Sequence, residues 1–130
     1  ATSAAPASGA ANQDIVWEPF SKESLAAHRA AGHAVFLDFT AEWCVSCKVN
    51  ERLVLSTDAF RAALAESGAA YLKGDWTNED PAITAFLQRF KAVGVPLYVV
   101  FPKSGGTPRV LPALLTQGTV GDALAWAGQP

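Results

Sequence analysis

The sequence lacks the residues that several common kinds of site require. Its 130 residues include only two cysteines and two histidines, whereas a zinc site takes three or four such ligands. The histidines, His28 and His33, do not stand at metal-ligand spacing to the cysteines, and we interpret them as solvent-facing. A formal net charge of −2 gives no reason to expect binding to nucleic acid or to an anionic membrane. No apolar run approaches the roughly 20 residues of a membrane span.

The N-terminal stretch also lacks a basic region followed by an apolar block. It is rich in Ala, Ser, Gly and Pro instead, so it is not an intact signal peptide. We interpret residues 1–14 as a flexible linker, or as the trimmed edge of a larger protein, and predict one folded domain over residues 15–130. A chain of this length buries about two thirds of its unfolded surface and does not need a disulfide for stability.

The pattern of apolar residues and turn signals alternates between strand and helix. Strands are predicted at 15–17, 35–40, 69–75, 97–101 and about 109–111, and helices at 22–31, 44–55, 59–66, 82–91 and 119–127. This order contains βαβ units and a closing hairpin. It predicts an α/β fold, with a central mixed sheet flanked by helices on both faces.

The two cysteines, Cys44 and Cys47, form a C-x-x-C motif between the strongest predicted strand and a helix. Exposed backbone N–H groups and the helix dipole stabilise a thiolate at such a helix start. One alternative is half of a zinc site, but the sequence has no second pair of ligands. The other is a purely structural disulfide, but a bond that closes so small a loop removes little conformational entropy from the unfolded chain. The motif therefore predicts thiol–disulfide exchange. Cys44 would be the more exposed nucleophile with the lower pKa, and Cys47 the shielded resolving thiol.

Three neighbours of the motif are candidate site residues. Asp38 interrupts a buried strand six residues before Cys44, and its carboxylate could exchange a proton with Cys47 and disfavour a thiolate on Cys44. Glu51 lies one helical turn beyond Cys47 and would add a second carboxylate, unless it is an ordinary surface glutamate. Trp43 would either offer an apolar contact surface beside the cysteines or pack in the core.

Pro96 directly precedes a predicted core strand, so it must stand at the start of the strand or at a bend. A cis Val95–Pro96 bond would free the Val95 backbone to pair with an extended partner segment beside Cys44. Only about one X–Pro bond in twenty is cis, and the residues alone leave this point open.

The stretch from Val35 to Lys48 resembles the active-site segment of the thioredoxin superfamily. More narrowly, the chain resembles the C-terminal periplasmic domain of DsbD-type thiol:disulfide interchange proteins, in three motifs: T-A-E-W-C-V-S-C-K-V-N-E, K-G-D-W-T and G-V-P-L-Y with a following L-P. This resemblance implies a thioredoxin fold, a cis Pro96, and an acidic pair, Asp38 and Glu51, that raises the pKa of Cys44. It implies no cofactor beyond the redox-active Cys44–Cys47 disulfide.

The resemblance also implies partners and a location. In this family a transmembrane domain of the same protein donates electrons, and an N-terminal periplasmic domain accepts them. The chain would then be a periplasmic domain of an inner-membrane protein, monomeric in isolation. Related Scs-type membrane reductases share the arrangement. A stand-alone thioredoxin-like oxidoreductase and a module that holds Cu(I) on two thiolates are the other functions left open.

Overall fold

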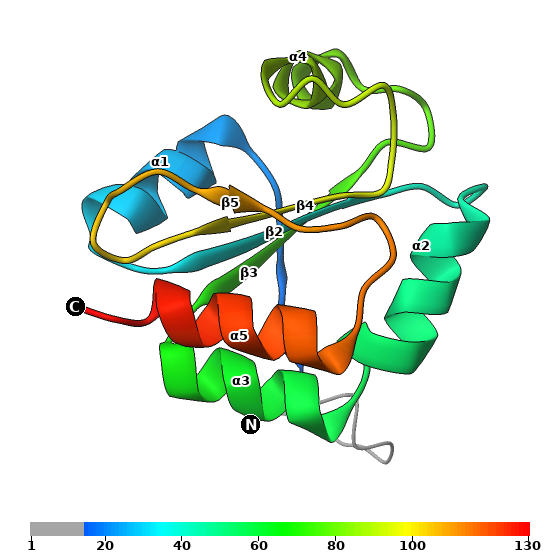
Figure 1. Cartoon of the computed structure of the whole chain (residues 1–130). Helices are drawn as coiled ribbons and strands as arrows, with labels where there is room; N and C mark the ends of the chain where they lie inside the picture. Colours follow the sequence, from blue (N-terminus) through cyan, green and yellow to red (C-terminus); the bar gives the residue numbers. More distant parts are fainter. Residues whose placement is uncertain (1–14) are drawn as a thin grey trace.

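The computed structural model describes residues 15–130, so the linker expected at 1–14 lies outside the described residues. Strands and helices alternate along the chain as predicted (Figure 1). The strands are β1 (Glu18–Pro19), β2 (Val35–Thr40), β3 (Ala70–Asp75), β4 (Leu97–Phe101) and β5 (Arg109–Val110). The helices are α1 (Lys22–Ala30), α2 (Val45–Asn50), the π-helical turn η2 (Glu51–Leu55), α3 (Asp58–Ser67), α4 (Pro81–Arg89) and α5 (Gln117–Ala127).

The five strands form one mixed sheet in the order β1-β3-β2-β4-β5. β2 pairs parallel with β3 and antiparallel with β4, so it lies at the centre of the sheet. Its near-continuous apolar sequence fits this position, because a central strand is covered on both faces. The register places Asp38 of β2 opposite Lys73 of β3 and Tyr98 of β4.

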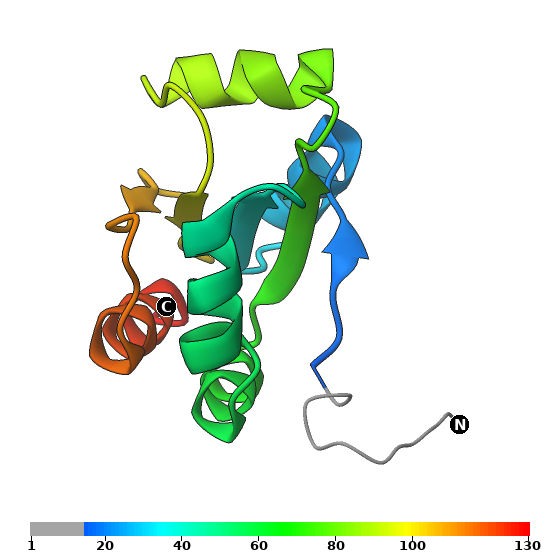
Figure 2. The same ribbon diagram turned by 90° about the vertical axis from the view of Figure 1, so that its right-hand side faces the viewer.

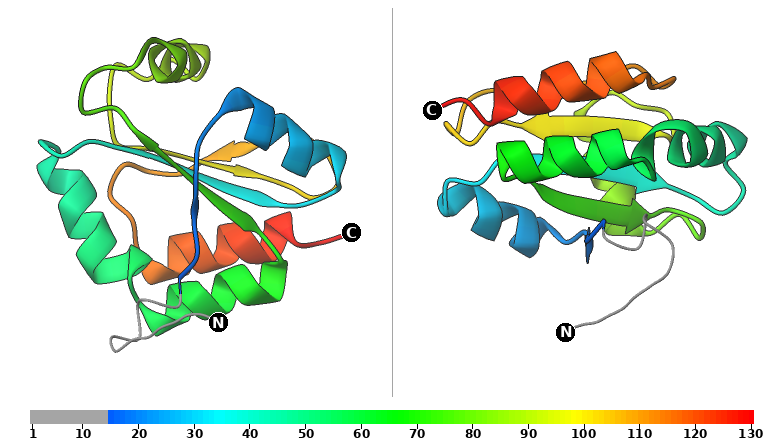
Figure 3. Two further views of the ribbon diagram at one scale, coloured as in Figure 1. Left: turned by 180° about the vertical axis from the view of Figure 1, so that it is seen from behind. Right: turned by 90° about the horizontal axis from the view of Figure 1, so that it is seen from below.

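Two hydrophobic clusters lie on opposite faces of the sheet. The cluster around Phe36 and Tyr98 packs against η2, α3 and α5, and the cluster around Phe39 and Leu97 packs against α1 and α4. Figure 2, a view along the sheet, separates these two helical layers, and Figure 3 shows α3 and α5 side by side below the sheet. The predicted α/β fold with helices on both faces is therefore confirmed.

Beyond shifts of one or two residues at the ends of elements, two predicted elements differ from the structure. The first strand lies at Glu18–Pro19 rather than at 15–17, because the chain pairs with β3 there and the Phe20 N–H then donates to the Lys73 carbonyl at 2.8 Å. An edge strand tolerates a proline, which has no N–H to contribute to a ladder. The helix predicted at 44–55 is α-helical only up to Asn50 and continues as the π-helical turn η2.

Candidate active site

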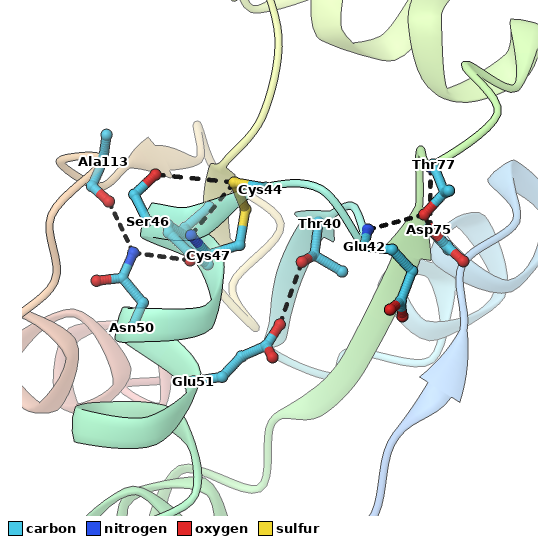
Figure 4. The surroundings of a disulfide bond; sticks show 11 residues. Thr40, Glu42, Cys44, Ser46, Cys47, Asn50, Glu51, Asp75, Thr77 and Ala113 are labelled. Atoms are coloured by element: carbon cyan, nitrogen blue, oxygen red, sulfur yellow. Dashed lines mark hydrogen bonds between the residues drawn. A yellow bond between two sulfur atoms is a disulfide. The ribbon is translucent and has the colours of Figure 1, made fainter.

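The two cysteines form a disulfide at the start of α2 (Figure 4). Cys44 is the N-cap residue of this helix, and its Sγ accepts a hydrogen bond from the Cys47 N–H at 3.2 Å. Both residues are buried, Cys44 at 5% exposure and Cys47 at 0%. Cys44, which was expected to be the more exposed cysteine, is thus only slightly more exposed than Cys47. The same backbone N–H would stabilise a thiolate on Cys44 once the disulfide is reduced.

Thr77 fixes the turn that leads into Cys44. Its hydroxyl oxygen accepts the Glu42 N–H at 2.8 Å, and its carbonyl accepts the indole N–H of Trp43 at 3.1 Å. The Asp75 carboxylate accepts hydrogen bonds from the hydroxyl and the N–H of Thr77, and these bonds lower the pKa of Asp75. Sequence reasoning did not assign this role to Thr77, because contacts across about 35 residues leave no local signal.

Trp43 and the segment before β4 border the disulfide. Trp43 is 53% exposed and its ring lies 6.0 Å from that of Trp76, so it does not pack in the core. The Val95–Pro96 peptide bond is cis. The partly buried Val95 packs against the small cluster of Ala41 and the two cysteines. These three candidate residues are therefore brought to the same end of the molecule as the disulfide.

Asp38 is almost completely buried, with 1% of its surface exposed. Its Oδ2 accepts a hydrogen bond from the Tyr71 hydroxyl at 2.8 Å, whereas its Oδ1 is buried without a partner among the described residues. Burial raises the pKa of Asp38 to about 6, against the lowering effect of Tyr71 and Lys73. The carboxyl group can therefore take up and release protons near neutral pH.

Glu51, the first residue of η2, reaches back toward the sheet. Its Oε2 accepts a hydrogen bond from the Thr40 hydroxyl at 3.1 Å. It also lines a cleft of about 250 Å³ whose wall includes Trp17, Lys48 and Lys73. Glu51 is thus not an ordinary surface glutamate on an open helix face, and Figure 4 shows it on the same side of α2 as Thr40.

Asn50 is a buried polar residue whose contacts the sequence did not indicate. Its amide nitrogen donates to the Tyr98 hydroxyl at 2.9 Å and to the Ala113 carbonyl at 2.7 Å, and its carbonyl oxygen accepts the Leu115 N–H at 3.0 Å. All its strong hydrogen-bonding groups are engaged. Asn50 therefore connects α2 to β4 and to the loop before α5. Its one signal in the sequence is its place one turn beyond Cys47.

The histidines lie away from the disulfide and contact each other. His28 Nδ1 and His33 Nδ1 are 2.9 Å apart, and His28 Nε2 lies 3.0 Å from a carboxylate oxygen of Glu18. The contact with Glu18 connects α1 to β1, and the His28 side chain is only 21% exposed. The expectation that His28 simply faces solvent was therefore wrong. Over residues 15–130, no group of three or more Cys, His, Asp and Glu side chains is arranged to hold a metal ion.

Residues 16–103 match the family described as Thioredoxin-like. The chain belongs to the thioredoxin-like family. The chain is 41% identical over 83 residues to the thiol:disulfide interchange protein DsbD of Ralstonia nicotianae. It is 40% identical over 84 residues to DsbD 1 of Pseudomonas aeruginosa.

These two matches cover 64% and 63% of this chain but only 13% and 14% of the relatives, so this thioredoxin-like domain corresponds to a small part of each. Among solved structures, the oxidised C-terminal domain of DsbD from Neisseria meningitidis matches with a TM-score of 0.65 at 22% identity, over 82% of this chain and 95% of that domain. Chloroplastic thioredoxin z matches with a TM-score of 0.63 at 22% identity, over 87% and 95%. Both show the thioredoxin fold. Fold, cysteine pair and sequence likeness together support thiol–disulfide exchange.

Proposed function

We propose that this domain is a protein-disulfide reductase module that relays electrons by thiol–disulfide exchange. The observation that carries the proposal is the Cys44–Cys47 disulfide at the start of α2, with the Cys47 N–H directed at the Cys44 sulfur. In the reduced protein this N–H stabilises negative charge on Cys44 and favours it as the nucleophile. Cys47, with no exposed surface, is the resolving thiol.

The reaction proceeds in two displacements. The Cys44 thiolate attacks one sulfur of a partner disulfide, which forms a mixed disulfide and releases the other partner sulfur as a thiolate. Cys47 then loses its proton and attacks the Cys44 sulfur. The Cys44–Cys47 bond forms, and the second partner thiolate leaves. The partner gains two electrons, and the domain returns to the oxidised state seen in the structure.

Asp38 and Glu51 supply the acid–base and electrostatic component. Asp38 lies on the face of β2 that carries Thr40. Thr40 contacts Glu51, which directly follows α2, the helix capped by Cys44 and called the redox helix from here on. With a pKa of about 6, Asp38 is the residue suited to take up the Cys47 proton. The negative charges of the two carboxylates disfavour a thiolate on Cys44 and so restrain its reaction with unsuitable partners.

The partner binds across Trp43 and Val95. Trp43 offers an exposed indole beside Cys44, and Val95 packs against the cysteines from the segment before β4. An extended partner segment would pair with the Val95 backbone and bring its cystine to Cys44. Pro96 has no N–H, which leaves Val95 as the pairing residue at this point.

The likeness to DsbD supports a place for the domain within a larger membrane protein. We propose that it is a periplasmic domain of an inner-membrane protein, recharged by a transmembrane domain and oxidised by an N-terminal periplasmic domain of the same protein. No helix of residues 15–130 is long and apolar enough to cross a membrane. A stand-alone thioredoxin-like oxidoreductase would have neither neighbour.

Trapping experiments test the exchange and its direction. Cys47→Ser should accumulate a mixed disulfide through Cys44, whereas Cys44→Ser should form none and should lose turnover of a model protein disulfide. Equilibration with glutathione gives the reduction potential, which should lie well below that of strong oxidants such as those near −120 mV. Full turnover by Cys44→Ser, or a strongly oxidising potential, would overturn the proposal. In the full-length protein, Cys47→Ser should be captured by the neighbouring domains, and a lack of capture would favour the stand-alone alternative.

A further inference from the structure

The two oxygens of the Asp38 carboxyl group have different surroundings. Oδ2 accepts the Tyr71 hydroxyl at 2.8 Å, and Oδ1 has no hydrogen-bond partner within the described part of the chain. A buried carboxylate needs hydrogen bonds to remain charged. The hydrogen bond from Tyr71 therefore favours the charged form of Asp38, whereas Oδ1 is left free to accept a proton.

Register and contacts place Asp38 on the sheet face that meets the end of α2. Side chains alternate along a strand, so Asp38 shares a face of β2 with Thr40, which contacts Glu51. Its antiparallel neighbour on the same face is Tyr98, whose hydroxyl accepts the Asn50 amide. These two contacts are made by Glu51 and Asn50, which follow Cys47 along the chain by about one helical turn. The Asp38 carboxyl thus lies beside Tyr71 on the face of the sheet that Asn50 and Glu51 contact.

The geometry points to Tyr71 as a positioning residue, whose hydroxyl holds Oδ2 of Asp38 and leaves Oδ1 to exchange the Cys47 proton. This inference rests on the proposed function and adds the residue that prepares its proton acceptor. In the resolving step the Cys47 S–H bond breaks and its proton joins Oδ1, so Asp38 becomes a neutral acid. The electron pair of the broken mixed disulfide leaves with the partner sulfur, which becomes a thiolate. Asp38 then passes its proton to this thiolate, either directly or by exchange with solvent.

Tyr71 is buried, with 4% of its surface exposed, and it also contributes to the wall of a cleft. Together with Trp17, Glu51 and Lys73 it lines this second cleft, of about 210 Å³. The Lys73 ammonium group lies 4.8 Å from the Trp17 ring and 5.5 Å from the Tyr71 ring. Tyr71 thus contacts the Asp38 carboxyl through its hydroxyl and also contributes to the wall of a cleft that carries charged side chains.

Several groups act on Asp38 from the elements packed against it. β3 contributes Tyr71 and Lys73, β4 contributes Tyr98, and η2 contributes Glu51, while α2 carries the cysteine pair. Burial raises the pKa of Asp38, the Tyr71 hydrogen bond and the charge of Lys73 lower it, and the charge of Glu51 raises it. Removal of the Tyr71 hydroxyl alone should therefore move the titration of Asp38 to higher pH.

The test is Tyr71→Phe in the intact chain, with Tyr98→Phe as the matched control. Both remove one buried hydroxyl from a strand next to β2, but the Tyr98 hydroxyl is bonded to Asn50. The titration of the Asp38 carboxyl carbon, followed by NMR with ¹³C-labelled aspartate, should shift upward by about one pH unit in Tyr71→Phe. It should shift far less in Tyr98→Phe. No shift in Tyr71→Phe, or equal shifts in both variants, would overturn the assignment.

A second measurement on the wild-type protein does not depend on how the variants fold. The ring carbon bonded to the Tyr71 hydroxyl should report the ionisation of Asp38 and titrate with the same midpoint, while that of Tyr98 should respond less. A flat Tyr71 profile would refute the hydrogen bond and with it the role. Neither titration involves a partner disulfide. A failure of the proposed exchange reaction can therefore be distinguished from a failure of the coupling between Tyr71 and Asp38. In turnover assays, Tyr71→Phe should shift the pH profile upward by the same amount as the Asp38 titration.

Discussion

The side-chain amide of Asn50 donates a hydrogen bond to the hydroxyl of Tyr98 at 2.9 Å. Through this bond the residue that ends the redox helix is attached to a central strand of the sheet. The same amide group binds the carbonyl of Ala113 and the N–H of Leu115, on either side of the exposed Leu114. One buried side chain thus fixes α2 relative to both the sheet and a loop near the disulfide.

Asn50→Ala should lower the free energy of unfolding by about 2–4 kcal/mol, because it leaves buried backbone and hydroxyl groups without their partners. Gln117→Ala is the matched control. Its amide nitrogen also donates two hydrogen bonds, to the Leu53 carbonyl and the Thr57 hydroxyl, but at the exposed surface, and its loss should cost less than about 0.5 kcal/mol. Urea unfolding of the oxidised proteins measures both changes. Similar costs for the two variants would contradict the role of Asn50.

Asp38→Asn should stabilise the protein at neutral pH. Burial raises the pKa of Asp38 from 3.8 to about 6 in the folded state. The stability that the neutral acid contributes is therefore complete below about pH 4 and is lost as pH rises through about 6. An uncharged amide avoids this loss, so the variant should gain up to about 3 kcal/mol at pH 7.5 and little at pH 4.

Thermal unfolding of the oxidised protein between pH 2.5 and pH 8 checks this dependence, since the cysteines do not titrate in the disulfide. Asp75→Asn provides a control of opposite sign. Hydrogen bonds from Thr77 lower the pKa of Asp75, so its contribution is present above pH 3.8 and is lost on acidification. A stabilising effect of Asp38→Asn that is the same at all pH values would contradict the link to ionisation.

The parts of the fold that could be predicted from sequence depend on local signals. The apolar run of β2 is found as a strand as expected, and the helices predicted from 22 and 82 begin at the N-cap Ser21 and with Pro81 in the first turn. Each signal is complete within a few residues, because caps and strand patterns act over one turn or one pleat. The C-x-x-C motif is local in the same sense, and it gave the reaction class.

The surroundings of the site could not be predicted, because they depend on contacts between distant residues. Tyr71 and Asp38 are 33 residues apart, and Asn50 and Leu115 are 65 apart. The apolar pattern around Tyr71 indicates burial, but it cannot tell which group its hydroxyl meets. The change from α- to π-helix at Glu51 is also not visible in the sequence, because both forms are built from the same kinds of residue.

Glu51→Gln should make the reduced cysteine pair reactive at lower pH. The Glu51 carboxylate is held near the end of the redox helix by Thr40, and its negative charge opposes a thiolate on Cys44. Loss of that charge should move the midpoint of the pH profile for alkylation by iodoacetamide down by roughly half a pH unit.

Glu42→Gln is the control for this change. Glu42 borders the same cleft, but it is exposed and paired with Lys48 at 3.5 Å, so solvent screens its charge. Its profile should stay close to that of the wild type. Equal profiles for Glu51→Gln and the wild type would remove Glu51 from the mechanism, whereas a large shift in Glu42→Gln would indicate a general effect of surface charge.

Gly74→Ala and Gly121→Ala should shift stability in opposite directions. A Cβ at Gly74 in β3 would lie 2.5 Å and 2.6 Å from two ring carbons of Phe39, whereas a Cβ at Gly121 in α5 would meet nothing within 4 Å. Phe39 cannot move freely, because its ring packs edge-on against Phe20 and Phe86. Gly74→Ala should therefore cost about 1–3 kcal/mol, and Gly121→Ala should gain about 0.5–1 kcal/mol, as expected in a helix interior.

Urea unfolding midpoints of the two variants measure these shifts against the wild type. Stabilisation by Gly74→Ala would mean that β3 does not approach Phe39 as closely as the structure shows. That spacing matters for function, because Gly74 follows Tyr71, which binds Asp38, on β3 and precedes Thr77, which lies just beyond β3 and holds the turn before Cys44. A displaced β3 should disturb both contacts, so Gly74→Ala should also slow disulfide exchange, while Gly121→Ala leaves its rate unchanged.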